Sequence, residues 1–188
     1  MSQLFPAKSA REPLNILRVR PAPGEATRGI VVAGAGKSRR AFPCALGRSG
    51  IGRKRGEGDG ITPLGQFRLI TAYWRPDKVR VYAYPLPSQA IFQNSGWCDE
   101  PGHPRYNRPV RLPFGASHER MWREDHLYDV VIVLDHNQSH HLSVGGSAIF
   151  FHLAREDFTP TEGCVAVSRE AMEYLLPRID GSTVIRIG

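Results

Sequence analysis

Cysteines are scarce in this 188-residue chain, and long apolar runs are absent. The three cysteines, Cys44, Cys98 and Cys164, are an odd number, which argues against a disulfide framework and leaves at least one thiol free. No apolar run approaches the roughly 18 residues of a transmembrane helix. Residues 1–21 contain no apolar core followed by a small-residue cleavage site, so no export signal is visible. As written, the chain is expected to be cytoplasmic, unless it is a mature form or leaves by another route.

Turn-forming residues and positive charge are abundant. Gly (19) and Pro (15) favour many turns and short strands, while the 41% hydrophobic content excludes wholesale disorder. The net charge of +7 indicates an acidic partner, and nucleic acid, anionic lipid and cell-wall polymer all qualify. No nucleic-acid-binding module is recognisable, so no nucleic-acid partner is expected.

The hydrophobic pattern predicts a mainly β protein, a sandwich or barrel with one or two short helices. Residues 1–13 are polar and are expected to form a loose leader, followed by a single domain over residues 14–188. Short runs rich in Val, Ile and Phe predict strands at 15–20, 29–33, 42–46, 65–72, 128–134, 147–153, 164–167 and 183–187.

One helix and one long irregular segment complete this prediction. Ser168 is a suitable N-cap, Met172 and Leu175 follow at helical spacing, and Pro177 marks the end of the helix. Residues 74–126 are dense in Pro, Trp, Tyr, His and Arg, and a segment of this kind inside a compact domain is usually a lid or a binding wall.

Two motifs suggest ligands, and for each the structural interpretation is favoured. The stretch GIVVAGAGKS, residues 29–38, has Val31 where a phosphate-binding loop requires glycine. His136, His140 and His141 lie near one another in the sequence, but no zinc-ligand spacing accompanies them. We therefore expect a glycine turn and a polar loop, with no metal and no cofactor.

The stretch FFHLAREDFTPTEGCVAVS, residues 150–168, carries the main chemical hypothesis. Cys164 follows Gly163 in a tight turn, where backbone N–H groups could face a developing oxyanion. Alternation along 147–153 places Phe150 and His152 on one face, so two neighbouring strands could bring imidazole and thiol together. A buried, inert thiol is the alternative, and these residues alone do not decide between the two.

At these residues the chain resembles the YkuD-type L,D-transpeptidase catalytic domain. That family carries a histidine at a strand end and a Ser/Thr-x-Gly-Cys turn before a short apolar strand, here His152 and residues 161–167. The segment GDGITPLGQF, residues 58–67, resembles the family's upstream Asp-Gly-x-Thr-Pro-x-Gly-x-Phe segment. The resemblance covers about residues 15–188.

The resemblance implies a β-rich fold and a thioester acyl-enzyme formed on peptidoglycan stem peptides or muropeptides. Cys164 would be the nucleophile and His152 its base, oriented by the carbonyl of Leu153 or Ala154. The N–H groups of Gly163 and Cys164 would stabilise the oxyanion. Transfer to an amine would give a crosslink or an exchanged D-amino acid. The alternatives are an L,D-carboxypeptidase that trims tetrapeptides and a catalytically silent cell-wall-binding module.

The same resemblance gives the long segment a role and exposes two departures. Residues 97–129 would form a wall or lid, with substrate-contacting side chains expected at Trp97, Tyr106, Asn107, Arg108, His118 and Glu119. Many members have Ser-His-Gly-Cys-Ile/Val-Arg, whereas this chain has Glu162 in place of that histidine and Ala166 in place of that arginine. The two substitutions suggest a divergent subgroup.

Overall fold

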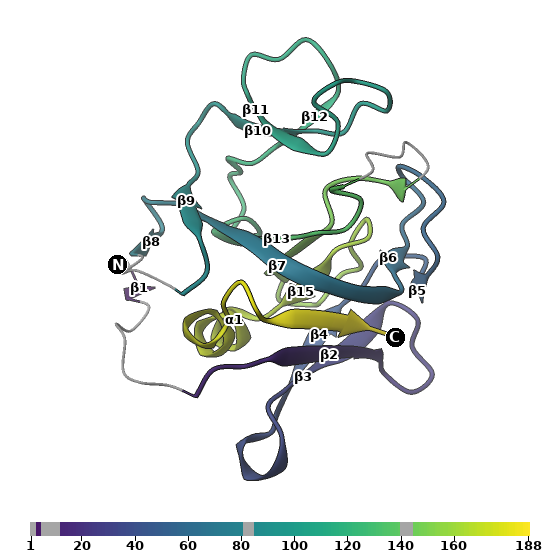
Figure 1. Ribbon diagram of the computed structural model, residues 1–188, viewed down its shortest axis with the longest axis vertical. Coiled ribbons are helices and arrows are strands. Elements are labelled where there is room, and N and C mark those ends of the chain that lie inside the picture. The colour runs from purple at the N-terminus through teal and green to yellow at the C-terminus, as the bar shows by residue number, and fades with distance from the viewer. Residues whose placement is uncertain (1–2, 5–11, 81–84, 140–144) are drawn as a thin grey trace.

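The computed structural model describes residues 3–4, 12–80, 85–139 and 145–188 (Figure 1). The strands are β1 Gln3–Leu4, β2 Ile16–Pro21, β3 Arg28–Ala33, β4 Arg40–Ala45, β5 Ile51–Gly52, β6 Thr62–Pro63, β7 Gly65–Trp74, β8 Val79–Arg80, β9 Ser88–Ala90, β10 Ser95–Cys98, β11 Arg108–Arg111, β12 His118–Arg120, β13 Val130–Leu134, β14 Phe150–Leu153, β15 Val165–Val167 and β16 Val184–Ile187. The helices are η1 Gly36–Ser38, α1 Arg169–Leu175 and η3 Leu176–Arg178. The predicted mainly β class is confirmed.

A single large sheet closes on itself. Its nine strands run in the order β13-β14-β15-β4-β3-β2-β16-β7-β9, and β13 also pairs with β7, which joins the two sides of the sheet into a barrel. The ten-residue β7 makes this closure possible, because its first half pairs with β16 and its second half pairs with β13. All eight strands expected from the sequence take part in the barrel wall.

Two apolar layers lie on either side of β13 and β14. Val130 and Ile132 point into the barrel core, whereas Val131 and Val133 pack in a second cluster outside the barrel wall. A strand buried on both faces reads as a continuous apolar run, as β13 does. In β14, Phe151 belongs to the inner core and Phe150 to the outer cluster, so the predicted alternation is confirmed.

The helix forms as its sequence signals predict. The Ser168 hydroxyl accepts a hydrogen bond from Ala171 N at 3.2 Å and so satisfies one of the free N–H groups of the first turn. Met172 and Leu175 are buried in the barrel core. Pro177 lies in the short η3 helix that follows, so helical structure extends to Arg178, one residue past the expected end.

The segment 97–129, called the lid below, contains more regular secondary structure than its composition predicts. Within the 74–126 region, β10 pairs with both β11 and β12 in a small antiparallel sheet, separate from the barrel. These strands are only three or four residues long, and Gly96 and Pro109 interrupt their apolar pattern, so sequence periodicity could not reveal them. The small sheet lies beyond β13, at the opposite side of the molecule from β2 and β3 (Figure 1).

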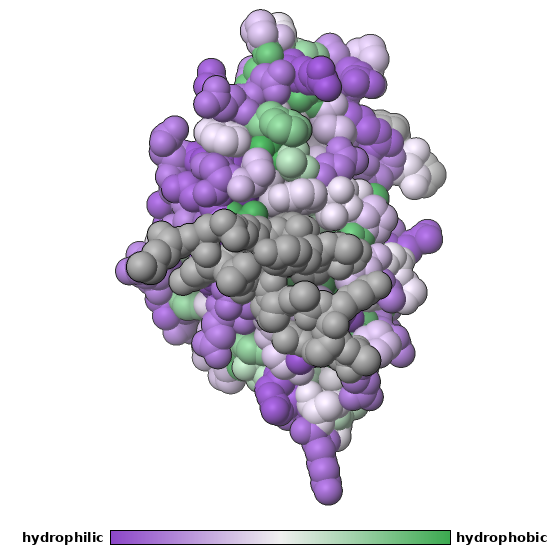
Figure 2. Space-filling view, turned by 90° about the vertical axis from the view of Figure 1, so that its left-hand side faces the viewer, coloured by the Kyte–Doolittle hydropathy of each residue, from purple (hydrophilic) through white to green (hydrophobic). Residues whose placement is uncertain are grey.

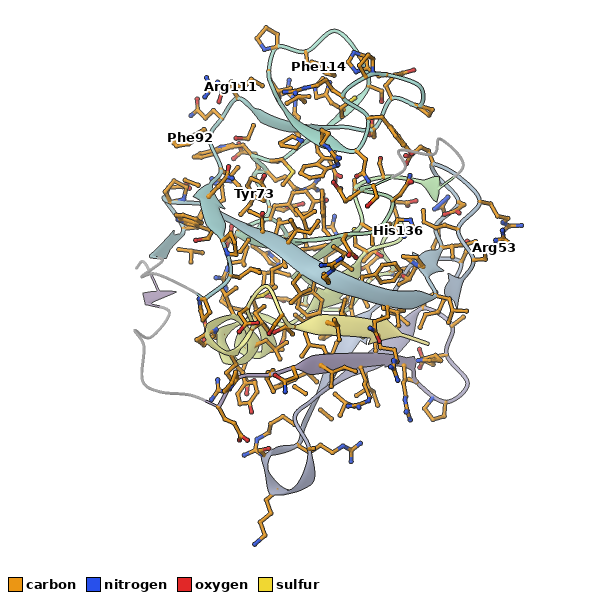
Figure 3. All side chains as sticks on the ribbon, viewed as in Figure 1. Arg53, Tyr73, Phe92, Arg111, Phe114 and His136 are labelled. Atoms are coloured by element: carbon orange, nitrogen blue, oxygen red, sulfur yellow. The ribbon has the colours of Figure 1, made fainter. Side chains whose placement is uncertain are left out.

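Side chains of the outer cluster attach this lid to the barrel. Tyr73 on β7 and Trp97 on β10 meet edge to face, with ring centroids 6.4 Å apart. In Figure 3, Tyr73 lies in the layer between β7 and the lid, and Phe114 lies near the lid's outer end. The lid is therefore anchored by aromatic packing at its base.

Near the N-terminus, Gln3–Leu4 pairs in parallel with Val79–Arg80. The division into a leader, residues 1–13, and one domain stays a prediction. In the described part of the chain, no helix has the length and apolar character needed to span a membrane.

Exposed apolar side chains are scattered. Leu64 and Phe92 are the most exposed large ones, at 60% and 59%. The face drawn in Figure 2 is largely hydrophilic, with small, separate hydrophobic patches.

Phe151→Ala is expected to lower the free energy of unfolding by about 3–5 kcal/mol, because it empties a fully buried site in the barrel core. Leu64→Ala, at an exposed site, is the control and should change it by less than about 0.5 kcal/mol. Urea denaturation followed by circular dichroism measures both. Equal destabilisation by the two variants would contradict the placement of Phe151.

Candidate active site

The imidazole and the thiol lie on one face of two adjacent strands. β14 and β15 pair in parallel with His152 opposite Ala166 and Phe151 opposite Val165, so Cys164, which precedes β15, lies one residue further back, level with Phe150. Side chains two apart share a face of a strand. Adjacent strands are about 4.8 Å apart and two residues span about 6.6 Å, which separates the two Cα atoms by roughly 8 Å. The predicted juxtaposition of the two strands is confirmed.

His152 is held in one orientation as a neutral ring. Its Nδ1 lies 2.8 Å from Leu153 O, and since a carbonyl oxygen can only accept, Nδ1 carries the proton and Nε2 keeps a free lone pair. Burial lowers the pKa of His152 to about 4, although the bond to Leu153 acts in the opposite direction. Of the two carbonyls expected to orient the ring, the Leu153 carbonyl is the one in contact. The Ala154 carbonyl is instead paired with His126 Nε2 at 2.9 Å.

Cys164 is a buried, protonated thiol in this structure. Its Sγ donates to Ala148 O at 3.3 Å and accepts from Phe150 N at 3.4 Å. Burial raises the pKa of the Cys164 thiol to about 12, and the nearby Glu119 carboxyl raises it further, while Phe150 N–H and Lys54 oppose the rise. No hydrogen bond joins Sγ to the His152 ring within the described residues. The resting pair is therefore thiol and neutral imidazole rather than thiolate and imidazolium.

The turn before Cys164 is braced by hydroxyl groups. The carbonyl oxygen of Cys164 accepts from Thr161 Oγ1 at 2.7 Å and from Thr62 Oγ1 at 3.3 Å. Gly163 N donates to Thr161 Oγ1 at 3.2 Å, so one of the two predicted oxyanion donors is already engaged. No acceptor for the Cys164 N–H is found among the described residues. These hydrogen bonds hold the backbone of the turn in one conformation and so fix the direction of the Cys164 side chain.

Gly163 is required where it stands. Its φ of +136° lies in a region that side chains rarely adopt, and a Cβ there would be 2.8 Å from Ile61 O and 3.3 Å from Lys54 Nζ. The turn that carries Cys164 therefore packs directly against the segment that contains Gly-Asp-Gly-Ile-Thr-Pro. This contact gives the second sequence motif its structural role.

Asp59 organises that segment. Its carboxylate accepts from Lys54 Nζ at 2.6 Å, from Arg55 N at 2.8 Å and from Ile61 N at 2.9 Å. Burial alone would raise the pKa of Asp59, but these bonds outweigh it and lower the pKa to about 2. The ion pair with Lys54 is itself buried, with side-chain exposures of 4% and 10%.

Lys54 is a site residue that the sequence did not reveal. In the sequence it stands between Arg53 and Arg55, and a basic triplet indicates a solvated surface. In the structure its side chain is buried beside Gly163 and contributes positive charge next to the thiol. The only sequence signal for this ion pair is that Lys54 lies five residues before Asp59. That spacing alone does not show that both side chains are buried and in contact.

A cavity of about 700 Å³ opens over the thiol and the imidazole. Its wall is formed by side chains of the two motifs, of β14 and of the lid: Lys54, Glu57, Gly58, Asp99, Glu100, Pro101, Ser117, Glu119, Arg123, Leu127, Tyr128, Ser147, Ala148, Ile149, His152, Leu153, Ala154, Arg155, Thr159, Pro160, Thr161, Glu162, Cys164 and Ala166. Cys164, His152 and Glu119 are the predicted side chains that line it. The lid therefore does form one wall of the site.

The other predicted lid residues lie outside this lining. Trp97 is 3% exposed, packs edge to face on Phe150 with centroids 5.2 Å apart, and donates to Asn107 Oδ1 at 3.0 Å. Arg108 donates to Gln138 O at 2.7 Å. These side chains connect the lid to the loop after β13.

Tyr106 and His118 also make contacts outside the lining. The Tyr106 hydroxyl donates to Glu57, which does line the cavity. His118 Nδ1 lies 2.8 Å from Ala116 O. The resemblance predicted that these residues contact substrate, and that stays a prediction; which of them face the cavity depends on the register of the short strands β10–β12.

The two departures from the commoner family pattern have separate structural settings. Glu162 is largely exposed at the cavity rim and forms an ion pair with Arg48. Arg48 Nη2 also donates to Gly58 O, so the ion pair joins the turn that carries Cys164 to the glycine-rich loop. Ala166 is 1% exposed on β15 beneath the cavity. The position that holds arginine in many members is therefore here a small apolar part of the cavity floor.

The histidine candidates for zinc are only partly described. His136 Nε2 lies 2.7 Å from Gly145 O, and its ring packs edge to face on Phe67 (Figure 3). His140 and His141 lie outside the described residues. Within the described residues, no group of three His, Cys, Asp or Glu side chains is arranged to hold a metal ion.

The lowered pKa of Asp59 predicts that the protein loses stability in acid. Its folded pKa of about 2 lies below the ordinary value of 3.8, so its contribution is complete above pH 4 and disappears as the pH falls toward 2. Urea unfolding of wild type and Asp59→Asn at pH 6, 4, 3 and 2 should show the two curves converging at low pH. A constant difference across this range would contradict the assignment.

Gly163→Ala is expected to lower the free energy of unfolding by at least about 1–3 kcal/mol through backbone strain. It should also displace Cys164, so thiol alkylation should change with it. Gly181→Ala is the control, because a Cβ at Gly181 meets nothing within 4 Å and its φ is ordinary. Thermal melts and timed alkylation followed by mass spectrometry measure both effects. Equal behaviour of the two variants would contradict the packing described.

Comparison with known proteins supplies the family. A sequence model of the YkuD family, the L,D-transpeptidase catalytic domain, matches residues 25–187. Searches of curated proteins and of solved structures found no match. The matched range includes both motifs, every strand of the barrel except β2, and the whole lid. The chain therefore belongs to the YkuD family of L,D-transpeptidase catalytic domains.

Proposed function

We propose that this protein is a cysteine-dependent L,D-transpeptidase that acts on peptidoglycan stem peptides through a thioester acyl-enzyme. The observation that carries this proposal is the placement of Cys164 and a neutral, oriented His152 on one strand face beneath a 700 Å³ cavity. Family membership supplies the reaction class. The nucleophile, its base and the substrate are proposals.

The protonation states favour general-base catalysis. His152 Nε2 accepts the proton of Cys164 as Sγ forms a bond to the substrate carbonyl carbon, because the thiol is protonated until it attacks. The Cys164 proton now faces Ala148 O, so the side chain rotates toward the imidazole during this step. The imidazolium then protonates the leaving D-amino acid nitrogen as the C–N bond breaks, which leaves a thioester.

The second half of the reaction reverses these roles. An acceptor amine attacks the thioester carbon, His152 removes its proton, and the C–S bond breaks with return of a proton to Sγ. The free N–H of Cys164 is the backbone donor best placed for the oxyanion, since Gly163 N–H is bound to Thr161. If water takes the place of the amine, the same site acts as an L,D-carboxypeptidase that trims tetrapeptides.

The proposed nucleophile is tested by acylation with a carbapenem, a small reactive acyl donor. Wild type should gain one covalent adduct, and Cys164→Ala should gain none. Cys44→Ala is the matched control, because Cys44 is also buried and burial raises its pKa to about 12, yet it lies in the barrel core. Intact-mass spectrometry measures the adduct, and equal labelling of all three proteins would contradict the assignment.

Products distinguish transfer from hydrolysis. Incubation with a purified disaccharide-tetrapeptide should yield crosslinked dimers and released D-amino acid, both lost in Cys164→Ala. Tripeptide without dimers would assign the carboxypeptidase activity instead. No reaction together with no carbapenem adduct would leave the silent binding module as the function.

A further inference from the structure

One side of the barrel carries positive charge and no acidic residues. The consecutive strands β4, β3, β2, β16 and β7 contain no aspartate and no glutamate, although arginine occurs in each of them. The net charge of +7 is therefore distributed unevenly, with an excess on this side of the molecule. A local excess of this kind produces a positive potential that attracts an anionic partner.

The arginines of β2 and β16 lie on the outer face of the barrel. The residues on either side of Arg18 and of Arg186 are buried in the barrel core, so both side chains point outward, and Arg20 shares their face two positions along β2. Arg18 and Arg186 are directly opposite each other in the parallel pairing of β2 with β16. Like charges in this arrangement destabilise a sheet, so the fold itself gains nothing from the pair. We call the outer surface of β3, β2 and β16 the basic face.

The cations of the basic face are not compensated by carboxylates within the part of the chain that the structure describes. The ion pairs that reach the five strands are Arg28 with Glu25 at 3.8 Å and Arg68 with Asp135 at 3.4 Å. The three arginines of β2 and β16 form no ion pair there, and Arg186 donates to a neutral glutamine side chain at 3.0 Å. Their charges are solvated and available to a partner.

The turn between β3 and β4 extends the positive charge. It contains Lys37 and Arg39, which are both exposed and form no ion pair with the described residues. In Figure 1 this hairpin projects from the lower end of the molecule, away from the lid. A partner of the basic face would therefore lie on the opposite side of the molecule from the lid and would leave the cavity over Cys164 open.

Aliphatic side chains are exposed beside these cations. Ile30 on β3 is 37% exposed and lies directly opposite Arg20 of β2. Leu64 is 60% exposed and lies against Gly188, the residue that follows β16. Basic side chains with aliphatic ones among them match the interface of an anionic bilayer, where phosphate groups pair with the cations and apolar groups enter the acyl boundary.

The same strands lack what a single-stranded nucleic acid requires. Proteins that bind such strands stack the bases on aromatic side chains. Phe42 is the only aromatic residue of β2, β3, β4 and β16, and it packs inward against the barrel core and Tyr174. A fully hydrated acidic polymer would also leave the exposed aliphatic groups in water. The apolar component therefore favours a lipid surface over a soluble polyanion.

We propose that the basic face binds the surface of an anionic phospholipid bilayer. Arg18, Arg20 and Arg186 lie against the phosphate groups, and Ile30 enters the boundary between headgroups and acyl chains. Binding is peripheral, and the lid and the cavity face away from the bilayer. This inference does not rest on the proposed function, because the basic face contains neither Cys164 nor His152.

The test is cosedimentation with lipid vesicles at about 0.1 M salt. Wild type should bind vesicles made of equal parts of phosphatidylglycerol and phosphatidylcholine, and should not bind vesicles of phosphatidylcholine alone. The triple variant Arg18→Gln/Arg20→Gln/Arg186→Gln should bind the mixed vesicles roughly 100-fold more weakly, because each basic residue near an anionic leaflet contributes roughly fivefold in affinity. Thermal melts followed by circular dichroism check that the variant is folded.

The matched control removes the same charge from the lid, as Arg105→Gln/Arg111→Gln/Arg120→Gln. These arginines are exposed and lie outside the cavity lining, and Figure 3 shows Arg111 at the end of the molecule away from β2. Charges further away than a Debye length, about 10 Å at 0.1 M salt, are screened, so the control should bind within about threefold of wild type. Equal losses in the two triple variants would overturn the basic face, since binding would then follow net charge alone.

A further variant separates lipid from other polyanions. Ile30→Ser should weaken binding to the mixed vesicles about 3- to 10-fold, because less apolar surface leaves water on binding, and should leave any binding to duplex DNA unchanged. Unchanged affinity of Ile30→Ser for the vesicles would overturn the proposal. Tighter binding of wild type to duplex DNA than to the vesicles at the same salt concentration would overturn it in favour of a nucleic acid partner.

Discussion

The parallel pairing of β14 with β15 is the constraint on which the site depends. It places His152 and Cys164 on one face of two adjacent strands, although Cys164 lies twelve positions after His152 along the chain. Parallel strands require a crossover, and here that crossover contains Thr161 and Gly163, which shape the turn before the thiol. The geometry of the reactive pair thus follows from backbone hydrogen bonds of the barrel wall, and the side chains themselves need no mutual contact at rest.

The burial of this pair decides its electrostatics. An exposed cysteine and histidine could exchange a proton before substrate arrives, but the cavity disfavours both charged forms, since burial raises the pKa of Cys164 and lowers that of His152. Nearby groups of opposite sign, Lys54 and Glu119, then act on the thiol from the loop and from the lid. Glu119 raises the pKa of the Cys164 thiol and Lys54 lowers it, so the two side chains oppose each other.

The sequence predicts the barrel strands, the capped helix and the β14 alternation because each depends on local periodicity or capping. It also brings Cys164 and His152 forward as a pair, since Thr-x-Gly-Cys and a strand-terminal histidine are local signals. The inward turn of Lys54 and the positions of Trp97 and Arg108 were not predictable in the same way. The positions of Trp97 and Arg108 depend on the register of strands that are only three or four residues long. The position of Lys54 depends on the packing of its loop against the turn at Gly163. Neither feature produces a periodic pattern in the sequence.

Cys164 and His152 lie on the outside of the barrel wall, beneath a small sheet that shares no strand with the barrel. The two candidate residues and part of the cavity wall therefore belong to two different sheets, which aromatic side chains hold together. Substitutions in β10–β12 can change the cavity without disturbing the inner core that stabilises β14 and β15. One sheet thus sets the separation of Cys164 and His152, whereas a second sheet sets part of the shape of the cavity above them.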